Sequence, residues 1–518
     1  MSTTLPILQD AAHKCGCGGF DSERTIKLEN LASEFKELVA RSITRNRGTD
    51  SDSEYLSWPE QLSSQETDEG GQSPPDEESD DSFLTGQSFE YSFSLVEPLR
   101  LGTKLSFHKI DGKYLWMSTY EAGLLVLDQG DHELFKRLTS GEHPSKLVEE
   151  IALRDGVTEH QAFRALAPLL GRVATAGFLK GIRGHTECKI PTPGKFARFH
   201  LTKACHLECI HCYAESSPRI DRSNEMSIEK WTKLTRGFAA NGGQQILFTG
   251  GEALMHTGCI ELMRLAKQLG LYVTLFTNGL LIPRHVKELS SCVDKVQVSL
   301  DGPDEETNDA IRGKGVFRGV IKAIDALLGA GISTQVGMTV MEENWNSWKT
   351  NFLTFAQRYA SESIEFKLSY GLNTYGRAEH MSEIDVNQTR PTVDALMSRV
   401  NGRKGPKIFR AQSGCGYGEQ LVVGPDGTVY PCHLLDVPIC NIADYDVPHL
   451  TSLLSNLARL VDVDHVEGCK ECDIRYLCGG TCRVIDGRKG GSRFQTTCTP
   501  EIKDRKYRAF VDTFSVSA

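Results

Sequence analysis

Three closely spaced cysteines are the residues best suited to chemistry in this 518-residue chain. Cys205, Cys209 and Cys212 form a C-x3-C-x2-C loop directly after the apolar run FARFHLT. An iron-sulfur cluster with four irons that is bound by three thiolates keeps one iron without a protein ligand, and that iron can chelate a substrate. A zinc ion is the alternative, and it would need His206 or His211 as a fourth ligand.

Further motifs follow this loop in the order Gly250-Gly251-Glu252, Asn278, Ser299 with Asp301, and Arg312. Together with the loop they resemble the radical SAM superfamily, over the chain from Ala197 to Cys498. The resemblance implies that the open iron binds S-adenosylmethionine (SAM) and that electron transfer cleaves the sulfonium to a 5′-deoxyadenosyl radical. These motif residues are then expected to contact the cofactor, as is His211, which would lie against the adenine. Arg312 would pair with the methionine carboxylate, although Arg318 competes for that role.

Seven more cysteines lie near the C-terminus: Cys415, Cys432, Cys469, Cys472, Cys478, Cys482 and Cys498. Their spacing is similar to that of the SPASM domain of radical SAM peptide maturases. The resemblance assigns Cys415, Cys432 and Cys482 to one auxiliary [4Fe-4S] cluster (auxiliary site I) and the other four to a second (auxiliary site II). Cys440 is a candidate fourth ligand of site I, which otherwise stays open. His433 is a candidate acid or base, with a structural hydrogen bond as the alternative.

The elements that must position these residues form an α/β domain over residues 184–404. Six apolar runs read as strands and alternate with helical segments: FARFHLT, QILFTGG, YVTLFTNG, KVQVSLDG, STQVGMTV and IEFKLSYG. This alternation predicts a parallel sheet curled into a partial (β/α)6 TIM-like barrel. Reactive groups of such barrels lie at the carboxyl ends of the strands, where the motifs fall. Residues 405–518 then form the SPASM domain.

Residues 97–183 predict a winged-helix domain. A hairpin turns at Asp111-Gly112, and three helical segments follow, the first of them around Gly123 to Leu138. The segment carries 12 basic and 11 acidic side chains, a balance that does not suit a DNA duplex. From Leu105 to Leu179 the chain resembles the PqqD-like recognition element, which implies capture of the leader of a ribosomal precursor peptide by strand addition.

Residues 1–96 predict one amphipathic helix followed by a disordered acidic linker. Cys15 and Cys17 lie in this region, and four interpretations stay open for them. They are cluster ligands, a redox pair, part of a substrate-like segment, or part of an ordinary disordered tail. The net charge is −10, and the stretch from Asp50 to Asp81 alone carries twelve acidic side chains. The rest of the chain is therefore nearly neutral, which predicts no nucleic-acid partner. The sequence has neither an export signal nor an apolar run of membrane-spanning length, and sixteen cysteines then suggest metal ligation in the cytoplasm.

These features favour a radical SAM peptide maturase that takes a hydrogen atom from a ribosomal precursor peptide and forms a thioether or carbon-carbon crosslink. A reducing partner such as a ferredoxin or flavodoxin would supply electrons, and three [4Fe-4S] clusters and SAM would be the cofactors. One alternative is a maturase of a folded protein partner, such as an oxidoreductase subunit or a sulfatase. Another is a peptide-binding iron-sulfur scaffold or electron carrier without radical chemistry.

Overall fold

The computed structural model describes residues 96–515 apart from residues 103, 119–122, 180–193, 361–363, 371–375, 383, 385, 401–411, 436 and 489–491. The predictions for residues 1–95, including the helix, the acidic linker and the roles of Cys15 and Cys17, lie outside the described residues. The predicted domain boundaries at 183/184 and 404/405 lie outside them as well.

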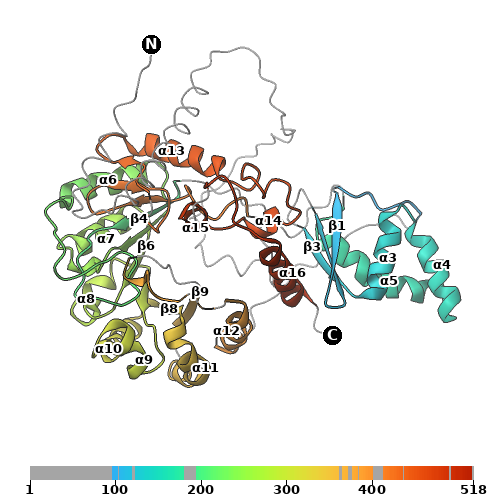
Figure 1. Cartoon of the computed structure of the whole chain (residues 1–518), viewed down its shortest axis with the longest axis horizontal. Coiled ribbons are helices and arrows are strands. Elements are labelled where there is room, and N and C mark those ends of the chain that lie inside the picture. Colours follow the sequence, from blue (N-terminus) through green and yellow to red (C-terminus); the bar gives the residue numbers. More distant parts are fainter. Residues whose placement is uncertain are drawn as a thin grey trace, which may run out of the picture.

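A nine-stranded sheet forms the centre of the larger part of the molecule (Figure 1). All six predicted strands are present and run parallel to one another in chain order. They are β4 (Phe196–His200), β5 (Gln245–Thr249), β6 (Tyr272–Thr277), β7 (Lys295–Ser299), β8 (Ser333–Val340) and β9 (Ile364–Tyr370). The predicted α/β class is therefore confirmed.

Helices follow these strands and lie along one side of the sheet in Figure 1. They are α6 (Ile228–Ala240), α7 (Cys259–Gln268), α8 (Ile282–Leu289), α9 (Glu305–Arg312), α10 (Val316–Gly329), α11 (Glu342–Gln357) and α12 (Val386–Val400). Their apolar side chains recur at helical spacing; in α10, for example, Val316, Val320, Ile324 and Leu327 are all buried. This stripe packs on the strands and forms the main core.

Three short strands that the sequence pattern did not predict extend the sheet beyond β4. They are β10 (Leu421–Val423), β11 (Thr428–Tyr430) and β12 (Cys440–Asn441). β10 runs parallel to β4, whereas β11 and β12 are antiparallel, so the sheet is mixed. Gly427 has a φ of 82° in the turn between β10 and β11, a conformation that favours glycine. This extension brings Cys432, two residues after β11, close to the first parallel strand.

The N-terminal part contains a three-stranded antiparallel sheet and three helices: β1 (Leu105–Ile110), β2 (Lys113–Ser118), β3 (Leu124–Leu127), α3 (Gln129–Thr139), α4 (Pro144–Asp155) and α5 (Glu159–Thr175). The predicted hairpin is confirmed, since Asp111 and Gly112 have φ angles of 48° and 80° between β1 and β2. The prediction that a helix begins near Gly123 was wrong. The run Leu-Leu-Val-Leu pairs with β2 as a strand, and α3 begins only after Asp128, whose carboxylate accepts from the Asp131 N–H.

Both faces of this small sheet are covered. One face packs on α3, α4 and α5 through Trp116 and Leu127. The other contributes Leu115 and Met117 to a cluster with Tyr507 and side chains near the second cysteine set. Tyr507 lies on α16 (Pro500–Phe514), which Figure 1 shows beside β1 and β3. The remaining helices are α13 (Val447–Leu460), α14 (Arg475–Cys478) and α15 (Arg483–Arg488). Among the described helices, none is long and apolar enough to cross a lipid bilayer.

Candidate active site

The three-cysteine loop begins a few residues after the carboxyl end of β4. Ala204 pairs with Ser217 in an isolated bridge, and the Cys205 N–H donates to the Ser217 carbonyl at 3.2 Å, which closes the base of the loop. Inside it, the Cys212 N–H donates to the Cys209 carbonyl at 3.2 Å. Burial, then the charges of Glu252, Cys209 and Cys212, raise the pKa of Cys205 to about 11. The three thiols therefore lie within electrostatic range of one another at the end of the first parallel strand.

Two glycines after β5 pack against the start of this loop. A Cβ atom on Gly250 would lie 2.4 Å from the Thr202 carbonyl oxygen, and one on Gly251 would lie 2.4 Å from that of Ala204. The Gly251 N–H donates to Thr202 at 2.7 Å, and the Glu252 N–H donates to Ala204 at 2.9 Å. The Gly-Gly-Glu motif thus fixes the cysteine loop through its own backbone.

The side chain of Glu252 links this motif to the end of β6. Its buried carboxylate accepts from the Thr277 hydroxyl at 2.9 Å, the Asn278 N–H at 2.8 Å and the Leu254 N–H at 3.2 Å. Burial raises its pKa, although these donors act in the opposite direction. The Asn278 amide lies 3.7 Å from the Cys205 sulfur. Two predicted site residues therefore connect to the cysteine loop.

Asp301, Arg312 and His211 form a buried charged cluster. One carboxylate oxygen of Asp301 lies 2.6 Å from Arg312 Nη2 and 3.2 Å from His211 Nε2. Burial opposes the ionisation of Asp301, but Arg312 and His211 hold its pKa below the usual range. The Nε of Arg312 and Nδ1 of His211 are buried without hydrogen-bond partners, so both remain for an incoming group. Ser299 is half-buried at the end of β7, two residues before Asp301 in the sequence.

Arg377 is a contact residue of the loop that the sequence pattern did not reveal. It lies in a short 3-10 turn, Gly376–Ala378. Its Nε donates to the Cys209 carbonyl at 2.9 Å and its Nη2 to the Ser216 carbonyl at 2.8 Å. A Cβ on Gly376 would lie 2.8 Å from the Cys212 carbonyl oxygen. Only the Gly-Arg pair after the sixth strand signals this turn, and such a pair is common in loops.

Among the seven C-terminal cysteines, Cys432 has Cys415 and Cys482 as neighbours, and Cys498 has Cys469, Cys472 and Cys478. Burial, then Cys415 and Cys482, raise the pKa of Cys432 to about 12. Burial raises the pKa of Cys498 as well, followed by its three neighbours Cys478, Cys472 and Cys469. Each of these two thiols therefore lies within electrostatic range of the others in its group.

These groups suit clusters better than single ions. Within the described ranges, no three His, Cys, Asp or Glu side chains converge closely enough to hold one metal ion. A zinc ion needs four ligands around one centre, whereas each thiolate of a cubane cluster binds a different iron and the sulfurs lie farther apart. Crowded, buried thiols also resist ionisation until a cationic group replaces their protons. Cysteine thiolates are the ligands of iron-sulfur clusters, so the donor types at all three places are compatible with such clusters.

Cys440, the candidate fourth ligand of auxiliary site I, lies in β12 opposite Val429. Burial, then the charge of Asp444, raises its pKa to about 12. The thiol packs in the main core.

His433 follows Cys432, and its Nδ1 lies 3.7 Å from the Cys432 sulfur. Burial, then the cations Arg198 and Lys367, lower its pKa to about 4. The imidazole is therefore neutral near pH 7 and has a free lone pair, although burial and the two cations make it a weaker base than an exposed histidine.

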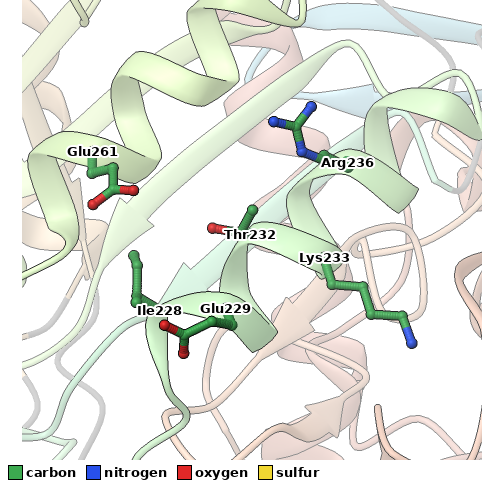
Figure 2. Close-up of a pocket in the computed structure, with 6 residues that line it drawn as sticks. All are labelled: Ile228, Glu229, Thr232, Lys233, Arg236 and Glu261. Atoms are coloured by element: carbon green, nitrogen blue, oxygen red, sulfur yellow. The ribbon is translucent and has the colours of Figure 1, made fainter.

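A surface hollow of about 480 Å³ lies elsewhere, between α6 and α7 (Figure 2). It is lined by Ile228, Glu229, Thr232, Lys233, Arg236 and Glu261. These side chains belong to the outer helical layer, and none of the predicted site residues is among them. We therefore place the candidate active site at the carboxyl ends of the strands.

Known proteins resemble this part of the chain. Residues 199–352 match the Radical SAM superfamily. The chain is similar to the AdoMet-dependent heme synthase of Nitratidesulfovibrio vulgaris, with 27% identity over 56% of this chain and 87% of the relative. It is also similar to the antilisterial bacteriocin subtilosin biosynthesis protein AlbA of Bacillus subtilis, with 30% identity over 46% of this chain and 54% of the relative.

Among solved structures, anSMEcpe with bound AdoMet and the Cp18Cys peptide matches with a TM-score of 0.50 and 20% identity, over 62% of this chain and 98% of that one. This likeness concerns the fold. The superfamily match covers β4 to most of α11 and contains the three-cysteine loop, the Gly-Gly-Glu motif and the Asp301 cluster. Residues 199–352 of this chain are therefore similar to the Radical SAM superfamily.

Proposed function

We propose that the chain is a radical SAM peptide maturase that removes a hydrogen atom from a ribosomal precursor peptide and forms a thioether or carbon-carbon crosslink. The observation that carries the proposal is the three-cysteine loop, which β5, Arg377 and the end of α9 hold at the carboxyl ends of the strands. The Ile210 N–H donates to the Ile311 carbonyl at 3.1 Å and supplies the last of these contacts. A cluster and SAM bound there would supply a 5′-deoxyadenosyl radical.

The protein residues have separate tasks in this proposal. Cys205, Cys209 and Cys212 would hold the SAM-binding cluster. The backbone of Gly250 and Gly251, the Asn278 amide and the free donor of Arg312 are available to the methionine end of SAM, while His211 borders the adenine site. The buried position of these groups excludes water, which protects a radical from side reactions.

The seven remaining cysteines support two auxiliary [4Fe-4S] clusters, with Cys469, Cys472, Cys478 and Cys498 at site II. Site I, with Cys415, Cys432 and Cys482, would keep an open iron that grips the substrate or carries an electron away. His433 is positioned beside it as a base. A ferredoxin or flavodoxin would reduce the SAM-binding cluster.

A peptide substrate is supported by two observations. AlbA is named for the biosynthesis of a bacteriocin, and anSMEcpe is solved with a peptide. The N-terminal sheet also has both faces covered, so a leader peptide would add as a strand at one of its edges. The winged-helix and PqqD-like assignments of residues 97–183 belong to this proposal, as do the SPASM assignment and a cytoplasmic location.

A second candidate is chemistry on an iron porphyrin, which the 87% coverage of the heme synthase relative favours. The two functions separate by substrate. Anaerobically reconstituted protein is mixed with SAM, dithionite and either the short peptides encoded beside its gene or iron-coproporphyrin, and 5′-deoxyadenosine is measured by mass spectrometry.

We expect a peptide to stimulate the formation of 5′-deoxyadenosine. The mass of that peptide should fall, because it gives up hydrogen when the crosslink forms. Replacement of Cys205, Cys209 and Cys212 by Ala should abolish cleavage while removing only about one-third of the iron. Product formation that is unchanged in this variant would reject the enzyme proposal, and stimulation by the porphyrin alone would replace the peptide with the second candidate.

A further inference from the structure

Arg198 lies in the middle of β4 on the face of the sheet that is turned away from the helices, called here the inner face. Its neighbours Ala197 and Phe199 belong to the main core, and the Phe199 ring lies 5.0 Å from that of Trp231 on α6. Successive side chains of a strand point to opposite faces. Arg198 and His200 therefore project from the inner face, the side on which the substrate of such a domain must reach the cysteine loop.

The Arg198 guanidinium has no anionic partner among the described residues. Its central carbon lies 5.7 Å from the ring centre of Phe276 on β6, and its Nε is buried without a hydrogen-bond partner. Burial lowers the pKa of Arg198, and the neighbouring side chains of Tyr213 and Cys432 act in the opposite direction. Tyr213 is the residue after the last cysteine of the loop, so Arg198 lies between the SAM-binding loop and auxiliary site I.

A second cation, Lys367, lies on β9, the last of the parallel strands, whereas Arg198 lies on the first. Lys367 on β9 pairs in register with Gly337 of β8, and together with Arg198 it lowers the pKa of His433 after burial. His200, on the same face of β4, also lies near Arg198, since burial, then Arg198, lowers its pKa to about 3. Arg198 and Lys367 thus make this part of the inner face positive.

The carboxylates on and after the neighbouring strands already have other partners. Glu365 pairs with Lys295 at 2.5 Å, Asp301 pairs with Arg312, and Glu252 accepts its three hydrogen bonds. Arg198 is half-buried, its Nε has no hydrogen-bond partner, and the Phe276 ring is a weak substitute for an anion, so this charge is incompletely compensated. An anion from outside the chain would complete that compensation.

We infer that Arg198, assisted by Lys367, binds a carboxylate of the substrate, namely an Asp or Glu side chain of the peptide. The inference rests on the proposed function and adds the substrate class to it. The planar guanidinium can bind both oxygens of a carboxylate at once. The bound carboxylate would hold the adjoining residue of the peptide between the cysteine loop and Cys432.

The test compares two synthetic peptides, acetylated and amidated at their ends, that differ only by Glu or Gln at one position. Their dissociation constants are measured by saturation-transfer NMR on the full-length reconstituted protein without reductant. We expect the Glu peptide to bind about tenfold more tightly, as one charge-assisted hydrogen bond allows. The preference should vanish in Arg198→Met and persist in Arg198→Lys.

Lys295→Met is the matched control, because it also removes a cation from the inner face but one that already has Glu365. It should keep the preference. Equal binding of the two peptides, binding of neither at millimolar concentration, or a preference that survives in Arg198→Met would overturn the inference.

Two further readouts identify other roles of Arg198. Weaker SAM binding with an unchanged peptide preference would assign the guanidinium to the methionine carboxylate and reject the substrate role. An altered electron paramagnetic resonance spectrum of the auxiliary clusters with an unchanged preference would assign it to Cys432, again against the inference. Because binding is measured without SAM cleavage, it is independent of whether the proposed reaction occurs.

Discussion

The imidazole Nε2 of His108 lies 2.7 Å from the Oδ2 of Asp473 and joins the N-terminal sheet to the second cysteine set. Asp473 directly follows Cys472. It also accepts from the Tyr507 hydroxyl at 2.8 Å and pairs with Lys503 at 2.8 Å. Burial opposes the charge of this carboxylate, but the three donors hold its pKa well below its usual range. A strand of the proposed leader-binding part therefore contacts a ligand loop of auxiliary site II.

Replacing His108 by Ala should weaken this junction. The variant loses the contact with Asp473 and the stacking on Tyr507, whose ring centre lies 4.3 Å away. We expect the free energy of unfolding to fall by about 1–2 kcal/mol, since the contact is partly buried and charge-assisted. Urea denaturation followed by circular dichroism measures this loss.

Arg154→Ala is the control for the junction, because its ion pair with Asp155 is exposed. That substitution should change stability by less than about 0.5 kcal/mol. If His108→Ala and Arg154→Ala gave the same unfolding midpoint, the junction would contribute nothing to stability.

Gly251→Ala should displace the three-cysteine loop. The new methyl group would lie 2.4 Å from the Ala204 carbonyl oxygen and 2.6 Å from that of Lys203, and backbone atoms on both sides cannot move independently. The expected result is loss of the SAM-dependent change in the electron paramagnetic resonance spectrum, while auxiliary clusters remain.

Gly171→Ala is the matched control, because Gly171 lies inside α5 and a Cβ there meets no atom within 4 Å. It should raise stability by up to about 1 kcal/mol through helix propensity and leave the clusters unchanged. A normal spectral response to SAM in Gly251→Ala would show that the loop tolerates the displacement.

Much of the site was predictable because its residues sit at strand ends that hydrophobic patterning identifies. Alternation of apolar runs located β4 to β9, and the cysteine spacing located the loop after β4. The start of α3 was not predictable in this way, because a four-residue apolar run reads equally as strand or buried helix until its pairing with β2 is known. β10 to β12 were missed because strands of two or three residues carry too little pattern.

Contacts that join distant segments were the other gap. The pairing of Asp301 with Arg312 and the reach of Arg377 to Cys209 depend on tertiary geometry, and no local spacing encodes them. Arg198 is a clearer case, since a basic residue inside an apolar run reads as an exposed position. Only the packing of Phe199 and Ala197 on the helices shows that Arg198 faces inward.

Arg377→Ala should make the SAM-binding cluster labile. The substitution leaves the Ser216 carbonyl without its Arg377 donor, at a cost of about 1–3 kcal/mol for an unpaired group. The Cys209 carbonyl keeps the Cys212 N–H as its donor. We expect faster iron loss to a chelator from this site, followed by absorbance. Arg318→Ala, whose exposed guanidinium pairs with Glu305, is the control and should lose iron at the wild-type rate. Equal rates for the two variants would count against a supporting role for Arg377.

The N-terminal part should lose stability as the pH falls below 6.5. His132 is buried, and its Nδ1 accepts from the Trp116 indole N–H at 3.1 Å. Burial lowers its pKa from the ordinary value of 6.5. Just below pH 6.5, His132 is protonated in the unfolded chain but still neutral in the folded chain. Proton binding therefore stabilises the unfolded state relative to the folded state. Above that pH, both states are neutral and the effect disappears.

His132→Asn separates this histidine from the others in the chain. The Asn side-chain oxygen can accept from Trp116 as Nδ1 does, but it does not titrate. The difference in unfolding free energy between wild type and variant should be constant above pH 6.5 and shift in favour of the variant as the pH falls. Urea titrations at successive pH values, followed by tryptophan fluorescence, measure it. A difference that stays constant down to pH 5 would mean that His132 takes up its proton in the folded protein as readily as in the unfolded chain, and the Trp116 contact would then have to survive protonation.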